Sequence, residues 1–456
     1  MELPLENPLR IWYNLYIRIS LCRFCGGKVK DMKKLIKNVT AITHSGELRG
    51  CIGINGKVID YIGAAEPSGY DEVIDGKNAI AVPGFVNAHA HLPMVLFRGY
   101  AEDMALQPWL FGKIFPAEAK LTPELVKWSS RVAIAEMIAG GTTSSSDMYY
   151  FCDEIISAVL ESGIKANISR GLSAFAETDV SKLVGFRETE ELFEKFDGAG
   201  DGRVKIDACL HSEYTNNEAV CRAVADFALE KKAVLHVHVS ETESEHCECI
   251  ERHGLTPTAF LEKCGCFRSP VLAAHCVWVT DEDMAIMAAN GASAAHNPSS
   301  NLKLGSGVAR VTDMLAAGVN VCLGTDGCSS NNNTDMFTEL HLASLCAKGF
   351  RRDPQALPVS QAFALANAAG AKAQGRDDTG VLEVGKRADI ALVGTEAPHM
   401  HPTYSATVAV VQSARAADVR MTMVDGEVLY KDGEYKTLDV EEAIFEMEKL
   451  VDKTYR

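Results

Sequence analysis

Short apolar runs alternate with tight turns at both ends of the chain. Over residues 32–83 the dipeptide Asn55-Gly56 lies between two such runs, which is a strong signal for a β-hairpin. The same pattern returns over residues 380–438, where Asp425-Gly426 separates two further runs. We therefore expect the two ends to build one small β-sandwich together, followed by an amphipathic helix over residues 439–456.

A different pattern fills residues 84–379, in which apolar runs of strand length alternate with helical stretches. Residues 123–139 and 281–290 are two of these helical stretches. The expected strands cover residues 85–89, 142–147, 166–170, 204–211, 233–238, 271–275, 292–296 and 320–326. Eight successive β/α units predict an α/β protein whose main domain is a TIM-type (β/α)8 barrel.

Polar side chains gather at or near the carboxyl ends of these expected strands. They are His89, Asp147, Arg170, His211, His238, His275, His296 and Asp326. Residues that fill a barrel core are branched and apolar, whereas the carboxyl ends of barrel strands carry the catalytic groups. The pattern therefore indicates an active site at this end of the barrel.

Three histidines and one aspartate among them form a candidate metal site. His89 and His91 are two positions apart, so on an extended chain both point to the same side and can bind one ion. His238 ends the fifth strand, and Asp326 follows an apolar run, where a buried carboxylate needs a partner. An aspartate that caps a helix is the alternative for Asp326 alone. Three imidazoles and a carboxylate suit a divalent ion with an open position for water.

Two further residues can handle protons beside such an ion. Glu241 follows His238 by three residues, and a carboxylate outside the metal shell can accept a proton from water. His275, at the end of the sixth strand, either binds the ion or hydrogen-bonds to the water and the substrate. His236 is expected one layer deeper, as a hydrogen-bonded core residue. This set predicts metal-assisted hydrolysis.

The composition favours a small-molecule substrate in a reducing compartment. The 456 residues are 47% hydrophobic and 23% charged, with a formal net charge of -16, which argues against nucleic acid and anionic membrane partners. No stretch is long and apolar enough to span a bilayer. The 14 cysteines have irregular spacings, which is typical of free thiols in the cytoplasm. The sequence leaves a homo-oligomer open.

Two cysteine-containing segments could hold a second metal, but a simpler interpretation is favoured for each. Residues 1–31 carry Cys22 and Cys25, yet no second C-x-x-C pair completes a zinc site, so an N-terminal extension outside the fold is expected. The run His246-Cys247-Glu248-Cys249, with Cys264 and Cys266 further on, lies in helix-favouring sequence, and a solvated helix face is expected there.

The motifs together resemble the amidohydrolase superfamily, and within it the 5'-methylthioadenosine/S-adenosylhomocysteine deaminase branch of the triazine-hydrolase-like group. The resemblance covers about residues 32–435. The matching motifs are Pro83-Gly84-Phe85-Val86-Asn87-Ala88-His89-Ala90-His91-Leu92-Pro93-Met94, Leu96-Phe97-Arg98-Gly99, Trp109-Leu110-Phe111, His238-x-x-Glu241, Ala274-His275-Cys276, His296-Asn297-Pro298-Ser299-Ser300-Asn301-Leu302-Lys303-Leu304-Gly305 and Gly324-Thr325-Asp326-Gly327.

This resemblance implies a mononuclear site, with zinc expected and iron as the alternative. The implied ligands are His89, His91, His238 and Asp326, with Glu241, His275 and Asp326 as the catalytic residues. Family members with two metals use a carboxylated lysine at the end of a middle strand, and no lysine occupies such a position here, which supports a single ion.

The resemblance also implies a nucleoside pocket. Glu118 would contact the ribose hydroxyls, while Arg170 and His211 would line the pocket. Arg187 is the nearest match to a second substrate arginine, although the length of residues 173–185 departs from the family pattern. The motif residues Trp109 and His296 are further candidate substrate contacts, and Glu241 would also touch the substrate.

The expected reaction is the hydrolytic deamination of 5'-methylthioadenosine, S-adenosylhomocysteine or adenosine to the inosine analogue and ammonia. A deaminase of guanine, 8-oxoguanine or a pterin, and a triazine-type hydrolase, are alternatives on the same scaffold. Glu118 with His211 favours a substrate that carries a ribose. A non-catalytic barrel used in assembly is the alternative of another class, and the complete ligand set argues against it.

Overall fold

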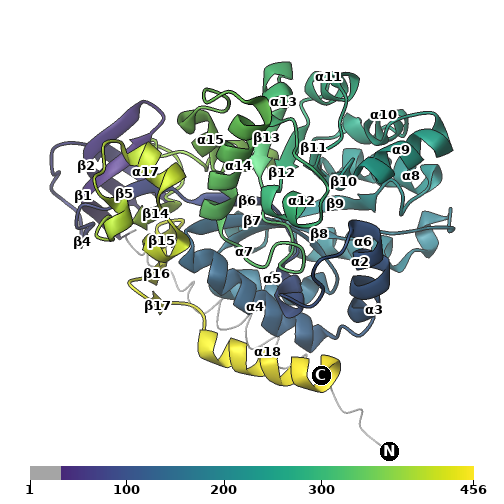
Figure 1. Cartoon of the computed structure of the whole chain (residues 1–456). Helices are drawn as coiled ribbons and strands as arrows, with labels where there is room; N and C mark the ends of the chain where they lie inside the picture. The colour runs from purple at the N-terminus through teal and green to yellow at the C-terminus, as the bar shows by residue number, and fades with distance from the viewer. Residues whose placement is uncertain (1–31) are drawn as a thin grey trace, which may run out of the picture.

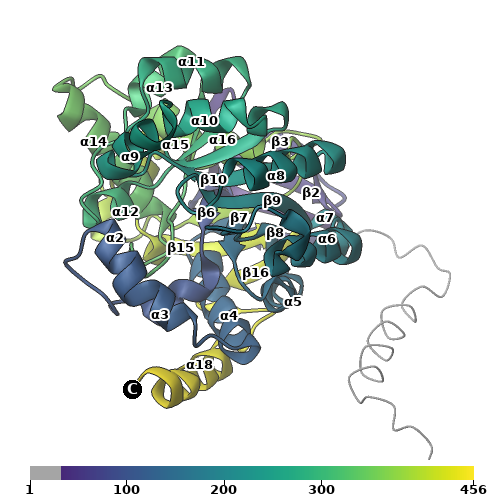
Figure 2. The same ribbon diagram turned by 90° about the vertical axis from the view of Figure 1, so that its right-hand side faces the viewer.

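A ring of eight parallel strands surrounded by helices forms the largest part of the computed structural model, which describes residues 32–456 (Figures 1 and 2). The strands are β6 (Phe85–Ala90), β7 (Thr142–Tyr149), β8 (Lys165–Arg170), β9 (Val204–Ser212), β10 (Leu235–Val239), β11 (Val271–His275), β12 (Ser293–His296) and β13 (Asn320–Leu323). They are hydrogen-bonded in sequence order. A bridge between Ala90 and Asp326 joins the last strand to the first, so the predicted (β/α)8 barrel is confirmed.

Helices follow the strands and cover the outside of the barrel. They include α4 (Pro123–Ala139), α5 (Cys152–Ser162), α6 (Val184–Phe196), α8 (Glu218–Lys231), α9 (Glu243–His253), α10 (Pro257–Lys263), α11 (Asp281–Ala289), α12 (Pro298–Lys303), α13 (Val311–Ala317), α14 (Met336–Arg351), α15 (Val359–Leu365) and α16 (Ala368–Ala373). The start of α4 follows from its sequence, because the Thr122 hydroxyl accepts the Leu125 N–H and Pro123 occupies the first helical position.

Residues 92–118 form an entry segment between β6 and α4. It consists of η1 (Leu92–Phe97), α2 (Leu106–Trp109), the π-helix η2 (Leu110–Ile114) and α3 (Phe115–Glu118). Other short helical elements are η3 (Val180–Lys182), α7 (Ala199–Gly202), η4 (Cys266–Arg268), η5 (Pro398–Met400), α17 (Ala406–Gln412) and η6 (Ala416–Asp418). Most of the apolar residues of the entry segment are buried, so it packs as part of the core.

Both ends of the chain build one sheet beside the barrel, as predicted (Figure 1). Its strands are β1 (Lys33–Thr43), β2 (Gly46–Asn55), β3 (Val58–Gly63), β4 (Glu72–Asp75), β5 (Ile80–Pro83), β14 (Ile390–Val393), β15 (Val419–Val424), β16 (Glu427–Lys431) and β17 (Glu434–Tyr435). The antiparallel pairing of β5 with β14 joins the two ends. Ile36, Ile52, Ile390 and Met423 belong to a core cluster of this sheet. The limits 32–83 and 380–438 stay predictions.

A buried charge cluster ties this sheet to the barrel. Lys165 begins β8, at the end of the strand opposite the predicted catalytic face. Its Nζ lies 2.6 Å from Oδ2 of Asp389 and 2.7 Å from Oδ1 of Asp425, both of which are buried. A buried ammonium group needs such partners, because desolvation of an unpaired charge is costly.

The C-terminal helix α18 (Val440–Tyr455) lies beside α4 (Figures 1 and 2). It begins where the Asp439 side chain accepts the N–H of Glu442, which agrees with the predicted terminal helix. Its last turn reaches the entry segment, where the Tyr455 hydroxyl donates to the carbonyl oxygen of Ala117 at 3.0 Å. Within residues 32–456, every helix is too short or too polar for a bilayer crossing.

Candidate metal centre and active site

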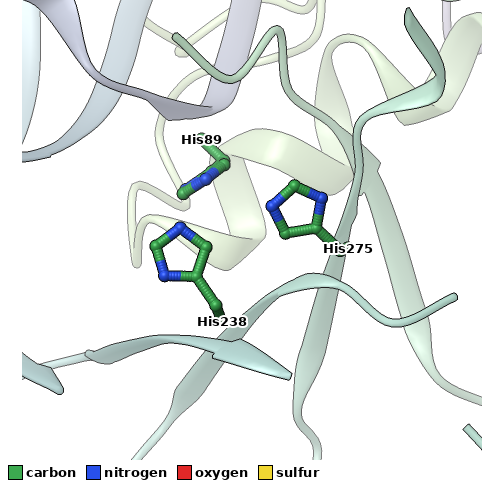
Figure 3. A group of neighbouring side chains, drawn as sticks. All are labelled: His89, His238 and His275. Atoms are coloured by element: carbon green, nitrogen blue, oxygen red, sulfur yellow. The ribbon is translucent and has the colours of Figure 1, made fainter. Parts of the chain in front are cut away.

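Four histidines and one aspartate converge at the carboxyl ends of β6, β10, β11 and β13. Side-chain ligand atoms of His89, His238 and His275 lie within 4.8 Å of one another, and those of His89, His91 and Asp326 form a second such group. Figure 3 shows the first group, in which the three rings face a common space. The two groups share His89, so the five residues surround one centre.

The orientation of each imidazole is fixed from behind through its Nδ1 atom. Nδ1 of His91 donates to the Met148 carbonyl at 2.5 Å, and Nδ1 of His238 donates to the His211 carbonyl at 2.6 Å. Nδ1 of His275 donates to Oδ1 of Asn301 at 2.8 Å. Such outer partners fix the orientation of each ring, so that Nε2 is the atom directed at the centre.

His89 is held by a second histidine instead of a carbonyl group. Its Nδ1 lies 2.9 Å from Nε2 of His236, whose own Nδ1 lies 3.5 Å from the Ser169 hydroxyl. His236 therefore lies behind His89, one layer deeper on β10, which is the position expected from the sequence. Burial lowers the pKa of His236 well below its ordinary value, which keeps it neutral and able to accept a hydrogen bond.

Asp326 lies between His89 and His91 on one side and two serines on the other. Its Oδ1 is 3.1 Å from Nε2 of His91 and 3.4 Å from Nε2 of His89. Its Oδ2 accepts hydrogen bonds from Ser300 at 2.6 Å and Ser330 at 2.8 Å. The backbone of Asp326 is left-handed, with φ 60°, which is uncommon for a residue with a side chain and typical of functional positions.

The donor atoms fit a divalent metal ion. Nε2 of His89 is buried and hydrogen-bonded to no group among the described residues. Burial lowers the pKa of His89 to about 4 and that of His238 well below its ordinary value, so both imidazoles are neutral donors. Burial opposes ionisation of Asp326, but the adjacent His89 and His91 side chains hold the pKa of its carboxyl well below the usual range. An anionic carboxylate and neutral imidazoles are ligands of zinc-type ions.

Glu241 adjoins this centre without being part of either ligand group. It follows β10, is buried, and its Oε2 lies 3.7 Å from Nε2 of His275. Burial raises the pKa of Glu241 to about 8, and the charge of Asp326 acts in the same direction. A carboxyl group with a pKa near neutrality can both accept and donate a proton in one reaction cycle.

A cavity opens onto the centre. One wall consists of the polar groups His91, His211, His238, Glu241, His275 and Asp326. The remaining lining is mainly aromatic and aliphatic, and consists of Met94, Leu106, Trp109, Leu110, Phe115, Glu118, Met148, Tyr149, Tyr150, Gly171, Tyr214 and Leu304. An apolar pocket with a few convergent polar groups is the usual form of a small-molecule site.

Glu118 is the one carboxylate of this cavity that does not adjoin the metal centre. It ends α3 and lies beside Tyr149. Burial raises the pKa of Glu118 to about 7, while the Tyr149 hydroxyl acts in the opposite direction. Glu118 is thus available as an acceptor for hydroxyl groups of a ligand.

The structure brings only some of the other candidate residues to this cavity. Trp109 and His211 line it. His296 is buried near His275 but does not line it. Arg170 lies in a second cavity, which shares Phe115, Glu118 and Tyr150 with the first. Arg187 is exposed on α6 and lines neither cavity.

Arg170 already has partners within the protein. Its Nε lies 2.6 Å from Oε2 of Glu188, its guanidinium group lies over the Tyr150 ring at 4.7 Å, and it donates to the Gly171 carbonyl. A ligand carboxylate would have to compete with Glu188 for this arginine.

Sequence inspection missed the residues that support the ligands. Ser300 and Asn301 lie in the motif that begins at His296, and Ser330 follows the Asp326 motif. This closeness in sequence to the candidate ligands could have predicted that they hydrogen-bond to them. Tyr149 and Tyr214, which line the cavity, gave no signal, because an aromatic residue at a strand end is equally typical of a core.

Within residues 32–456, no cysteine belongs to a group of side chains that could hold a metal ion. The two groups found there are the histidine groups described above. His246, Cys247 and Cys249 lie on helix α9, as expected. The expected solvated face is wrong, because only Cys247 is exposed, whereas His246, Cys249, Cys264 and Cys266 are buried. Cys22 and Cys25 lie outside the described residues.

Comparisons with known proteins agree with this architecture. Residues 80–429 match the Amidohydrolase family. The 5-methylthioadenosine/S-adenosylhomocysteine deaminase of Dictyoglomus thermophilum is 44% identical over 379 residues, which cover 83% of this chain and 88% of that protein. The protein of the same name from Moorella thermoacetica is 42% identical over 428 residues, covering 92% and 99%.

Two solved structures carry zinc on the same fold. An adenosine deaminase from Xanthomonas campestris with bound zinc has a TM-score of 0.87 at 29% identity, covering 93% of this chain and 98% of that one. An atrazine chlorohydrolase from Arthrobacter aurescens complexed with zinc has a TM-score of 0.85 at 25% identity, covering 92% and 100%. The chain belongs to the amidohydrolase family, in the group that contains the 5-methylthioadenosine/S-adenosylhomocysteine deaminases.

Proposed function

We propose that the protein catalyses the hydrolytic deamination of adenine nucleosides that carry a 5'-thioether, with one zinc ion per chain and iron as the alternative. The observation that carries this proposal is the arrangement of a single cavity. Its polar wall holds the candidate ligands and Glu241, while Glu118 lies apart from them among aromatic residues. The relatives described above are named for the same reaction type, which supports the assignment.

The metal would be held by His89, His91, His238 and Asp326. A divalent ion in such a site lowers the pKa of a water molecule toward neutrality and stabilises negative charge on oxygen. Glu241 would accept a proton from the attacking water and deliver it to the ring nitrogen beside the reacting carbon. His275, 3.7 Å from Glu241, would hydrogen-bond to the same oxygen. The second proton of that water would pass to the amino group, so that the C–N bond breaks, ammonia leaves and the oxygen becomes the carbonyl of the product.

Substrate selection would come from Glu118 and the second cavity. Ionised Glu118 can accept hydrogen bonds from both ribose hydroxyls, and such bonds to a charged group contribute about 1.5–3 kcal/mol each. The second cavity, lined by Phe151, Phe175 and Arg170, adjoins Glu118 and would receive the 5' substituent. We propose that Arg170 binds the carboxylate of S-adenosylhomocysteine when Glu188 releases it. Arg187 stays a weaker candidate for this contact, because it is exposed outside both cavities.

The alternative reactions on this scaffold fit the cavity less well. Guanine, a pterin or a chlorotriazine has no ribose, so the half-buried Glu118 would meet no hydroxyl group of the ligand. A site that has buried a charged acceptor discriminates against ligands that leave it unpaired. This argument favours a nucleoside over a free base or a triazine.

A substrate panel on the zinc-loaded protein tests the proposal. Ammonia release would be measured with methylthioadenosine, S-adenosylhomocysteine, adenosine, adenine, guanine and atrazine. We expect methylthioadenosine or S-adenosylhomocysteine to have the highest kcat/KM and adenine to be a poor substrate. A preference for guanine, free adenine or the triazine would overturn the nucleoside assignment. Arg170→Met should impair S-adenosylhomocysteine far more than methylthioadenosine.

A further inference from the structure

The start of helix α9 departs from the usual capping arrangement. In a capping box, the side chain of the third helical residue bonds back to the N–H of the capping residue. Helix α11 has this ordinary form, because Oδ2 of Asp283 accepts the N–H of its cap, Thr280, at 2.9 Å. In α9 the cap is Thr242 and the corresponding residue is Glu245.

Glu245 reaches past the cap to the two residues before it. Its Oε1 accepts the N–H of Ser240 at 3.2 Å, and its Oε2 accepts the N–H of Glu241 at 2.6 Å. The helix itself does not require these bonds, since the Thr242 hydroxyl already caps it by accepting the N–H of Glu245. The carboxyl group of Glu245 therefore holds the backbone of Ser240 and Glu241 by two hydrogen bonds.

The backbone held in this way has an unusual conformation. Ser240 is left-handed, with φ 48°, which a residue with a side chain adopts only when its surroundings impose it. The carbonyl of Ser240 accepts the N–H of Trp278 at 3.0 Å, and its hydroxyl lies 3.2 Å from Nδ1 of His246. The N–H of Ser240, in turn, donates to the Glu245 carboxyl group.

The side chain of Glu241 depends on this backbone for its direction. Its Oε2 atom lies 3.7 Å from Nε2 of His275, which is beyond hydrogen-bond distance. No side-chain hydrogen bond within residues 32–456 orients the Glu241 carboxylate. Its position in the cavity therefore follows from the backbone, which Glu245 fixes from behind.

We infer that Glu245 is a positioning residue, whose buried carboxylate aims the Glu241 side chain at the reacting atoms. Glu245 is 1% exposed and does not line the cavity, so it acts through Glu241 and not on the ligand. This inference rests on the proposed role of Glu241 in proton transfer. A misdirected Glu241 carboxylate slows proton transfer, whereas substrate binding depends on Glu118 and the aromatic residues. Substitution of Glu245 should therefore lower kcat and leave KM little changed.

The first test is the variant Glu245→Gln in the zinc-loaded enzyme. Its amide keeps one acceptor oxygen but turns an NH2 group toward the second backbone N–H, which breaks one of the two bonds. We expect kcat to fall about 10- to 100-fold, as for a small misplacement of a reacting group, with zinc content and KM little changed. Glu243→Gln is the matched control, because Glu243 lies in the same helical turn but is exposed. It should leave kcat unchanged.

A double-mutant cycle separates positioning from general support of the fold. In the Glu241→Gln background there is no proton-transferring carboxylate to aim, so adding Glu245→Gln should not lower the residual turnover further. An additional loss equal to that in the wild type would overturn the inference. So would normal kcat in Glu245→Gln, whereas normal turnover in Glu241→Gln alone would overturn the proposed function instead.

A second variant covers the case in which Glu245→Gln does not fold. Glu245→Asp keeps the carboxyl group but is one methylene shorter, so it can reach at most one of the two N–H groups. The same fall in kcat with retained zinc would support the inference, and wild-type kcat would contradict it.

Discussion

Glu241 and the candidate metal ligands adjoin one another but should respond differently to substitution. Glu241→Gln preserves the shape of the side chain and removes its ability to accept a proton. We expect the variant to keep its zinc and to lose about 10²- to 10⁴-fold in kcat, the usual contribution of one acid–base group. Metal analysis and turnover of the same sample check this. Loss of zinc would identify Glu241 as a ligand.

The ligands themselves should control metal content. His89→Ala and Asp326→Ala each remove a donor from a buried centre with few alternatives, so we expect both to lose the ion together with activity. The wild type should contain about one ion per chain, because the five residues surround one centre. Elemental analysis of dialysed protein checks this, and two firmly bound ions per active chain would contradict it.

The pKa of Glu118 predicts a pH-dependent affinity for the ribose. Burial raises this pKa to about 7, so below that pH the carboxyl is protonated and can no longer accept both ribose hydroxyls. The inhibition constant of the product methylthioinosine should therefore fall as the pH rises from about 6 to about 8. Hypoxanthine, which has no ribose, is the matched control ligand. The trend should vanish in Glu118→Gln, and its persistence there would assign it to another group.

At the scale of elements, helix α18 should influence the ribose site through one hydrogen bond. The Tyr455 hydroxyl donates to the carbonyl of Ala117, the residue before Glu118, and its ring packs on Phe97 at 5.5 Å. We expect Tyr455→Ala to raise KM for methylthioadenosine several-fold and to change kcat little. Tyr455→Phe, which keeps the ring, should have a smaller effect. Steady-state kinetics check this, and unchanged KM in Tyr455→Ala would exclude the coupling.

The sequence predicted the regular elements well because their signals are local. Helix α4 has the predicted limits, and all eight barrel strands lie within a few residues of the expected ranges. The largest difference is β13, which ends at Leu323, whereas the strand was expected to reach Asp326. Asp326 lies beyond the strand and has a left-handed backbone, so its carboxylate is directed toward His89 and His91 by a turn and not by the strand. Strand propensity contains no information about such a turn.

The candidate ligands could be recognised from sequence because strand ends of a parallel barrel meet at one face. Arg187 shows the limit of this reasoning, because it lies on a helix whose rotation is set by packing. The ion pair between Arg170 and Glu188 could not be predicted either, because it depends on how residues 171–187 fold between them. The Glu245 bonds to Ser240 and Glu241 were also unforeseen, because an ordinary capping box has the same sequence spacing.

At the scale of the whole molecule, Lys165 should matter for stability and not for catalysis. It is 4% exposed and paired with Asp389 and Asp425. Lys165→Met therefore leaves the buried Asp389 without an ion-pair partner, whereas Asp425 keeps Arg203 and Arg387. Breaking a buried ion pair from one side costs about 3–5 kcal/mol, because the remaining charge stays desolvated. Lys165 begins β8 at the end away from the active site, so kcat of the folded variant should be unchanged.

Urea unfolding of the zinc-loaded protein, with activity measured before denaturation, checks this prediction. Lys195→Met is the matched control, because Lys195 forms an exposed ion pair with Glu191 on one face of α6. Such surface pairs contribute about 0.3–0.5 kcal/mol, so the control should hardly move the unfolding midpoint. Equal midpoints for the two variants would mean that the cluster does not hold the terminal sheet to the barrel. A large fall in kcat for Lys165→Met would instead mean that the Lys165 charge cluster, which connects the terminal sheet to the barrel, affects the distant metal centre.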